Sequence, residues 1–336
     1  MRSVVTIRDV AELAGVSVST VSNALSGQRV VSQVTRQRIQ DAAQQLGYRP
    51  NTAAHSLRTG VHHAIGLVVP DVTNPFFAEI AHGAETAANA LGWSVYLGNT
   101  ELDEDREDNY LRRLATASDG ILFFPTSNTG SRMTQIQSLV DNDVQMVICD
   151  ERIRVAGTGG VFSDNVAGGR LAAAHLTARG ARRCAMITGP ETLPTSNERR
   201  KGYGAGLRAA GRSLPAERVI HAPYTIEGGQ SATAELLRRD ARIDAIFAAD
   251  DLQAVGALEG LAAAGRAVPD DVLVCGFDGI AWGALVRPSL TTVAQQSQQI
   301  GAEAARLLLQ MVTMEASPRE IVLPVELLER DSTRRA

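Results

Sequence analysis

Residues 6–26 read TIRDVAELAGVSVSTVSNALS, and this stretch decides how the N-terminal part of the chain folds. Thr6 followed by Asp9 predicts a helix start, because a Thr N-cap and an acid three positions later can satisfy each other's backbone N–H groups. Apolar residues at helical spacing follow, and Gly15 ends this first helix. Ser17 is placed to cap a second helix. Two short helices joined by a turn that contains Gly indicate a helix-turn-helix.

The outward residues of the second helix are candidates for contact with DNA. Val18, Ser19 and Asn23 lie in its first half, off the apolar stripe, where a recognition helix reaches base edges in the major groove. Asn can bond bidentately to adenine, and Val offers methyl contact to thymine. A third helix is expected between Ser32 and Gly47, so a plain three-helix bundle without a DNA role is the alternative. The candidates for positioning contacts to the DNA backbone are Thr6, Ser17, Thr20, Ser22 and Ser32.

The charges are divided unevenly between the two ends of the chain. Residues 1–60 carry seven Arg, no Lys and three acidic residues, a net charge of +4. Because the whole chain has a net charge of −4, the other 276 residues carry −8. The contrast between a basic N-terminal segment and an acidic remainder of the chain favours a polyanion as the partner of residues 1–60 alone.

The N-terminal motifs resemble the signature of the lactose-repressor (LacI/GalR) family of bacterial transcription regulators. The match covers TIRDVAELAGVS at residues 6–17, TVS at 20–22, TR at 35–36 and LGYRPN at 46–51. It spans some fifty residues in register, so the chain is identified as a member of that family. The resemblance implies a repressor whose affinity for operator DNA is controlled allosterically by a small ligand.

The resemblance also implies how the first sixty residues are divided. Residues 1–49 would be the helix-turn-helix headpiece, and residues 50–60 a hinge helix that folds on the operator. Leu57 matches the leucine that each subunit of a dimer wedges into the minor groove, which bends the duplex. Asn51 can cap this helix, and His55 stands where the family commonly has Arg; both join the candidates for DNA contact. The alternative is that Leu57 is a core residue of a linker.

From Ala64 the pattern changes to short apolar runs that alternate with helical stretches, and this alternation continues to Gly276. It predicts an α/β core of parallel sheets covered on both faces, with ligands at the carboxyl ends of the strands. The resemblance implies the two-lobed fold of periplasmic sugar-binding proteins, with effector and dimerisation functions in residues 61–336. The expected lobes are about 61–162 with 293–323, and about 163–291 with 325–336.

Seven residues near strand ends are candidates for effector contact: Asn74, Phe76, Thr195, Asn197, Arg199, Tyr224 and Asp278. Of these, Arg199, Tyr224 and Asp278 match ligand-binding positions of the family, and Asn74 and Phe76 lie in a segment that resembles its first ligand loop. The guanidinium group of Arg199 can donate paired hydrogen bonds, which suits two hydroxyl groups or a carboxylate. Asp278 would accept hydrogen bonds from sugar hydroxyls or base nitrogens. A surface salt bridge is the alternative for Arg199 and Asp278. Leu193 stands where purine-responsive members carry Arg, so a sugar or sugar derivative is favoured. The alternative is that the ligand is a nucleobase or another small polar metabolite that acts as a corepressor.

The sequence carries no pattern typical of an enzyme, a cofactor site or a metal site. The glycines at 157–160 and 168–169 lack the Lys-Ser/Thr of a phosphate loop and the spacing of a dinucleotide site. His62 and His63 are adjacent and point apart on a regular element, which makes them poor metal ligands. The three cysteines lack C-x-x-C spacing, and we expect them reduced and buried.

Compartment and assembly follow from similar patterns. No stretch approaches the ~20 apolar residues of a membrane span, and no apolar signal region precedes the first helix. We therefore expect a cytoplasmic protein on the nucleoid rather than a secreted binding protein.

Two headpieces on one operator require a two-fold dimer, with the helix at 76–91 as a candidate interface. The polar residues 329–336 cannot extend a coiled coil, so we expect a dimer rather than a tetramer.

Overall fold

The structure, a computed structural model of the 336-residue chain, describes residues 5–26, 31–48 and 61–335. The chain divides into two compact units, Met1–His62 and His63–Ala336, which are described separately. None of the described helices is long and apolar enough to cross a membrane.

The N-terminal unit contains three short helices around a small core. One fully buried side chain from each helix, Val10, Val21 and Ile39, meets the others in this core. The Asp9 carboxylate accepts hydrogen bonds from the backbone N–H of Thr6 (2.7 Å) and from its hydroxyl (2.9 Å), which fixes the first helix start. The helices are α1 (Ile7–Ala14), α2 (Val18–Ser26) and α3 (Gln33–Leu46).

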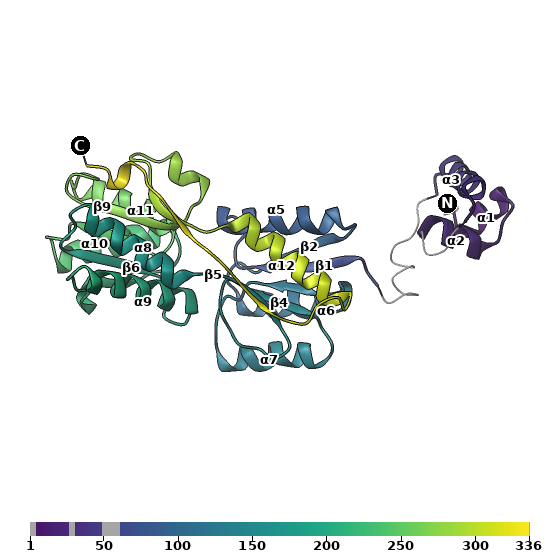
Figure 1. Cartoon of the computed structure of the whole chain (residues 1–336), viewed down its shortest axis with the longest axis horizontal. Coiled ribbons are helices and arrows are strands. Elements are labelled where there is room, and N and C mark those ends of the chain that lie inside the picture. The colour runs from purple at the N-terminus through teal and green to yellow at the C-terminus, as the bar shows by residue number, and fades with distance from the viewer. Residues whose placement is uncertain (1–4, 27–30, 49–60, 336) are drawn as a thin grey trace. The chain divides into compact units, whose positions relative to one another are not determined.

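The second unit has two lobes, each built on a six-stranded sheet (Figure 1). In lobe 1 all neighbouring strands are parallel, in the order β11-β5-β4-β3-β1-β2. The strands are β1 (Ala64–Val69), β2 (Ser94–Asn99), β3 (Ile121–Phe123), β4 (Met146–Cys149), β5 (Gly159–Ser163) and β11 (Glu320–Leu323). The helices are α5 (Pro75–Ala90), α6 (Glu104–Ala117), α7 (Gly130–Asp141) and α12 (Ser297–Val312).

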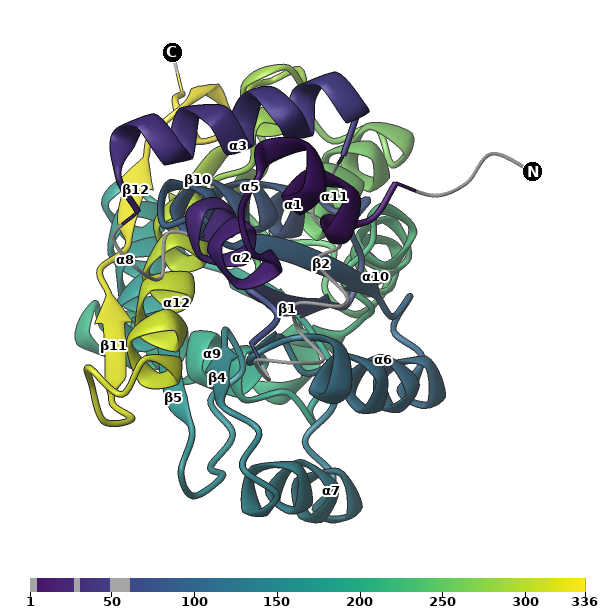
Figure 2. The same cartoon turned by 90° about the vertical axis from the view of Figure 1, so that its right-hand side faces the viewer.

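Side chains of β1 alternate between the two faces of the lobe 1 sheet, as the strand period requires. Ile65, Leu67 and Val69 pack in the cluster that contains α5 and α12, whereas Val68 packs in the cluster that contains α6 and α7. Helices therefore cover both faces (Figure 2), and every residue of β1 is buried. This explains the continuous apolar run of that strand.

Lobe 2 repeats this architecture in the order β12-β10-β9-β8-β6-β7. Its strands are parallel except for the edge strand β12, which runs antiparallel to β10. The strands are β6 (Cys184–Thr188), β7 (Val219–His221), β8 (Ala245–Ala248), β9 (Leu273–Asp278), β10 (Thr291–Ala294) and β12 (Glu326–Leu328). The helices are α8 (Asn165–Ala178), α9 (Pro194–Ala209), α10 (Ile226–Arg239) and α11 (Asp251–Ala263), with short 3-10 turns at 216–218, 281–284 and 331–333.

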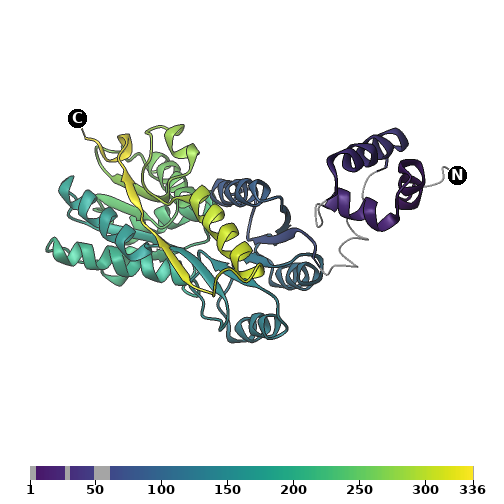
Figure 3. The same ribbon diagram turned by 45° about the vertical axis from the view of Figure 1, so that its right-hand side comes forward.

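The α/β class and the two-lobed core of parallel sheets that the sequence predicts are confirmed. The chain crosses between the lobes three times, after β5, after β10 and between β11 and β12, and Figure 3 shows the last crossing in yellow. The second crossing was expected at residues 290–292, which is too early. Residues Thr291–Ala294 pair with β9 and β12, so they belong to lobe 2 and the chain leaves that lobe only after Ala294.

Candidate functional site

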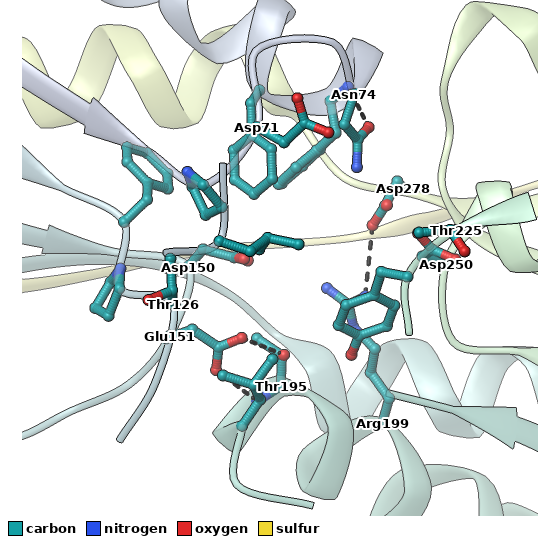
Figure 4. Close-up of a pocket in the computed structure, with 18 residues that line it drawn as sticks. Asp71, Asn74, Thr126, Asp150, Glu151, Thr195, Arg199, Thr225, Asp250 and Asp278 are labelled. Carbon is teal, nitrogen blue, oxygen red and sulfur yellow. Dashed lines mark hydrogen bonds and ion pairs between the residues drawn. The ribbon is translucent and has the colours of Figure 1, made fainter. Parts of the chain in front are cut away.

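A cavity lies between the two lobes, at the carboxyl ends of the parallel strands. It encloses about 750 Å³ including the part open to solvent, within the range of small-molecule sites. Both lobes contribute polar side chains that point into it (Figure 4). Its polar lining is Asp71, Asn74, Thr126, Asp150, Glu151, Thr195, Arg199, Thr225, Asp250 and Asp278. Its other walls are Pro70, Phe76, Phe77, Leu102, Phe124, Pro125, Leu193 and Tyr224.

Six of the seven residues expected at the effector site line this cavity, and Asn197 does not. The amide group of Asn197 donates hydrogen bonds to the carbonyl oxygens of Glu191 (2.7 Å) and Leu193 (3.1 Å). These bonds hold it in a separate surface groove beside Arg200 and Lys201. The position of Asn197 near the start of α9 was therefore misleading, because its helix face turns away from the lobe boundary.

The loop after β1 supplies one wall of the cavity. Asn74 caps α5 through its Oδ1, which accepts the backbone N–H of Phe76 at 3.0 Å. Phe76 is buried, and its ring meets that of Phe77 edge-on at 5.2 Å between centroids. Phe77 in turn meets Phe124 at 6.0 Å. Phe77 is half-buried and lines the cavity as well.

Arg199 is the only basic side chain in the cavity lining. Its Nε donates to Oδ1 of Asn165 (2.8 Å) and its Nη1 to the carbonyl oxygen of Ala249 (2.6 Å). Nη1 also lies 3.5 Å from Oδ1 of Asp278, and the guanidinium stacks 3.9 Å above the Phe277 ring. The side chains of Arg199 and Asp278 are only 4% and 6% exposed, so the alternative of a surface salt bridge is wrong.

Two neighbouring acids at the end of β8 have different roles. Asp250 lines the cavity and caps α11, because its Oδ1 accepts the backbone N–H of Gln253 at 2.7 Å. Asp251 lies deeper and accepts the N–H groups of Gly279 and Ile280, both at 2.8 Å. It therefore holds the turn that follows β9 and so the backbone that carries Asp278.

A carboxylate of lobe 1 is hydrogen-bonded to lobe 2 across the cavity. Glu151, just after β4, accepts the backbone N–H of Thr195 at 3.0 Å and its hydroxyl at 2.6 Å. Both residues are buried. The Thr195 hydroxyl, expected at the ligand site, is thus already engaged by the protein.

Sequence reasoning missed Asp150 and Glu151, although a detectable signal was present. Both follow the apolar run of β4, and Asp278, which was singled out, similarly stands at the carboxyl end of β9. The backbone of Asp150 has a φ of +63°, and its Oδ1 is buried without a hydrogen-bond partner among the described residues.

Tyr224 forms a rigid aromatic wall. Its hydroxyl is hydrogen-bonded to Oγ of Ser196 at 2.7 Å. The ring packs so closely on Gly189 that a Cβ there would lie 2.2 Å from a ring carbon. Glycine at 189 therefore allows the ring to stand at the cavity edge.

Burial governs the electrostatics of the cavity. It raises the pKa of Glu151 to about 8 and that of Asp250 to about 7. Burial also raises the pKa of Asp150, and that of Asp278 well above its usual range, although Arg199 acts in the opposite direction on both. Burial alone would lower the pKa of Arg199, but Asp278 and the neighbouring acids raise it overall. One guanidinium is thus shared among four carboxyl groups.

In the N-terminal unit, most of the residues proposed to contact DNA lie at the starts of the helices, whereas Asn23 lies in the second half of α2. Val18 is 41% exposed and Ser19 is exposed, whereas Asn23 is half-buried. The Ser17 hydroxyl caps α2 by accepting the backbone N–H of Thr20 at 3.1 Å. The side chains of Thr6 and Ser32 are exposed, and those of Thr20 and Ser22 are half-buried. Asn51, His55 and Leu57 lie outside the described residues.

A helix-turn-helix unit joined to a two-lobed core with a polar cavity defines the class of ligand-responsive transcription regulators. The family profile of bacterial regulatory proteins of the lacI family matches residues 6–51. The profile of periplasmic binding proteins and sugar binding domain of LacI family matches residues 62–331. The chain belongs to the LacI family.

Individual relatives resemble the chain over its whole length. A ribose operon repressor of Halalkalibacterium halodurans is 34% identical over 333 residues, 98% of this chain and 97% of that protein. The transcriptional regulator CelR, solved with cellobiose, is 33% identical with a TM-score of 0.73. The Lac repressor dimer, solved with operator and the anti-inducer ONPF, is 25% identical with a TM-score of 0.87. Each of these two structures covers 98% of this chain, which covers 99% of each of them.

Proposed function

We propose that this protein is a sequence-specific transcriptional repressor whose operator affinity is set by a small polyhydroxylated ligand bound between the lobes. The observation that carries the proposal is the inter-lobe cavity, where hydrogen-bonding side chains and aromatic walls converge from both lobes. A ligand that contacts both lobes stabilises one arrangement of the lobes over another. Such a differential affinity is what an allosteric effector requires.

The DNA contacts are assigned by chemistry and exposure. Val18, Ser19 and Asn23 read base edges in the major groove. Hydroxyl side chains around the helix starts hold the DNA backbone and fix the register. These positioning residues are Thr6, Ser17, Thr20, Ser22 and Ser32, with Asn51 and His55 in the hinge. Leu57 opens the minor groove between the two half-sites.

The ligand contacts combine hydrogen-bonding groups with apolar walls. Asp278 and Asn74 face the cavity from opposite lobes and bond hydroxyl groups (Figure 4). Phe76 and Tyr224 cover the apolar faces of a sugar ring. Arg199 orients Asp278, and Thr195 completes the wall through its bond to Glu151. Leu193 adds an apolar contact with no hydrogen bond for a purine, which supports a carbohydrate over a nucleobase.

The repressor acts as a homodimer, because one operator carries two half-sites related by two-fold symmetry. Large apolar side chains stand exposed on the 3-10 turn after β9 and just beyond it, with Trp282 44% and Leu285 73% exposed. Side chains of this size at neighbouring exposed positions favour a protein partner, and a second copy of this chain would cover them. The similar Lac repressor, solved as a dimer bound to its operator, supports the same assembly.

The protein performs no catalysis in this proposal, and it works in the cytoplasm on the nucleoid, where its operator is. Both oxygens of Glu151 accept hydrogen bonds from Thr195, and Asp278 bonds Gln295. Their role is to hold a ligand.

The test begins with selection of bound duplexes from a random DNA library, followed by gel shifts on the enriched sequence with and without candidate sugars. We expect an enriched two-fold palindrome and a sugar that changes its affinity. Arg199→Ala and Asp278→Ala should abolish that change, whereas Arg238→Ala, which removes an exposed Arg–Glu pair, should not. Failure to enrich any sequence rejects the repressor function, and a full ligand response in both cavity variants rejects the site.

Leu57→Ala tests the hinge separately. Loss of the wedge should greatly weaken binding to the enriched operator while leaving weak, salt-sensitive binding to random DNA almost unchanged. Unchanged operator affinity would reject the role of Leu57.

A further inference from the structure

Acidic side chains outnumber basic ones in the lining of the inter-lobe cavity. Five acidic side chains and one basic side chain line it, and the basic one is Arg199. Two of the acids, Asp150 and Glu151, come from the end of β4 in lobe 1, and Asp250 and Asp278 come from lobe 2. All four lie close enough to Arg199 to interact with it electrostatically. Asp71 is half-buried at the mouth.

The protein's own hydrogen bonds leave part of this acidic lining unused. Both oxygens of Glu151 are occupied by Thr195, and Oδ1 of Asp278 accepts Nε2 of Gln295 at 2.7 Å. In contrast, Oδ1 of Asp150 is buried and has no partner among the described residues. A buried polar atom without a partner is destabilising, so native proteins rarely keep one without a use for it.

The backbone at two of these acids is strained. Asp150 has a φ of +63° and Asp278 a φ of +107°, a region that residues with a Cβ rarely adopt. One belongs to each lobe, and both side chains face the cavity (Figure 4). Strained backbone persists where the geometry serves a function. Here the strain aims two carboxyl groups at the same space from opposite sides.

The excess of acidic side chains determines which class of ligand fits the inter-lobe cavity. A phosphate or carboxylate would meet three buried acids, the half-buried Asp150 and a single guanidinium that is already engaged. A neutral sugar would fill their hydrogen bonds but would leave the acids in the protonated form that burial favours. A metal ion does not fit, because the described residues contain no group of three or more His, Cys, Asp or Glu placed to hold one. An ammonium group instead stabilises the ionised form of the acids, and the rings of Phe77 and Tyr224 at the same cavity also favour a cation.

We propose that the effector is an amine-bearing polyol of the amino-sugar class, whose ammonium group lies between Asp150 of lobe 1 and Asp278 of lobe 2. This inference rests on the proposed ligand-controlled repressor and names the chemistry of its ligand. The ammonium group provides the missing partner of Asp150 and draws the two acidic lobe edges together. The hydroxyl groups of the ligand bond Asn74 and the free carboxylate oxygens, and its apolar face lies on Phe76.

The experiment measures binding of matched sugar sets to the full chain by isothermal titration at pH 7. Each set contains an amine, its neutral counterpart and its acid: D-glucosamine, D-glucose and D-glucuronate; D-galactosamine, D-galactose and D-galacturonate. The ring-nitrogen analogue deoxynojirimycin is compared with D-glucose. We expect at least one amine to bind about tenfold or more tightly than its neutral counterpart, because charge-assisted hydrogen bonds are the stronger ones, and neither uronate to bind.

The variant Asp150→Asn removes one charge and suits the backbone, since Asn tolerates positive φ well. It should weaken binding of the amine about tenfold and binding of the neutral sugar less than about twofold. The matched control is Asp143→Asn, which has the same φ of +63° but is exposed in the turn before β4, at the opposite end of that strand. It should change neither affinity, and melting of each ligand-free variant verifies its fold.

The outcomes separate this inference from the proposed function. If a neutral sugar binds as tightly as every amine, if a uronate binds most tightly, or if no amine binds, the amine-bearing ligand is rejected. In each case selective binding to the enriched palindrome would leave the repressor function standing. A chain that enriches no DNA sequence fails as a repressor whatever its ligand.

Discussion

Removal of the hydrogen bond between Thr195 and Glu151 tests whether this bond holds the two lobes together. Thr195→Val replaces a buried hydroxyl with a methyl group of similar size, so it creates no cavity. It removes the 2.6 Å bond across the cavity and leaves the backbone bond of residue 195 in place. Loss of a buried hydrogen bond to a carboxyl group costs about 2 kcal/mol. For a unit of this size, that lowers the melting temperature by about 3–4 °C.

The assay is thermal and urea unfolding followed by tryptophan fluorescence, because Trp93 lies in lobe 1 and Trp282 in lobe 2. The control is Thr233→Val, a fully buried threonine whose hydroxyl bonds only the Gly229 carbonyl within its own helix (2.9 Å). It should cost less than half as much, since such bonds within a helix add little. Equal losses in both variants, or no loss in Thr195→Val, would refute a stabilising bond between the lobes.

Three further predictions concern DNA reading, pH and assembly. Asn23→Ala should cost about 1–3 kcal/mol, mostly at one base pair per half-site, in gel shifts on single-base operator variants; uniform weakening would place Asn23 on the backbone instead. Burial raises the pKa of Asp250 to about 7 and of Glu151 and Asp251 to about 8, so the native core keeps protons that the unfolded chain releases above about pH 5. Its stability should therefore fall as pH rises from about 5 to about 8 and then level off, and melting temperatures that rise over this interval would contradict the burial of these acids. Leu285→Glu should dissociate the dimer in light scattering at micromolar concentration, and an unchanged mass would move the interface elsewhere.

The sequence was sufficient where a property depends on neighbours along the chain. The Thr6–Asp9 pair and the Ser17 cap fixed the helix starts of the N-terminal unit, because capping involves residues within one turn. The apolar runs from Ala64 gave the α/β class, since strands buried on both faces need no polar alternation. Strand-end positions also led to Arg199, Tyr224 and Asp278.

The tertiary structure alone decided which strand-end residues share one cavity. Asn197 is two residues from Arg199, yet its side chain turns to the outer surface, because successive helical residues face different directions. The helix α12 returns to lobe 1 after the expected alternation has ended, and Thr291–Ala294 stays in lobe 2 because its pairing partners are there. The bond between Glu151 and Thr195 joins residues 44 apart in the chain. The sharing of Arg199 among four acids likewise depends on distances through space, and only the packing of the two lobes sets those distances.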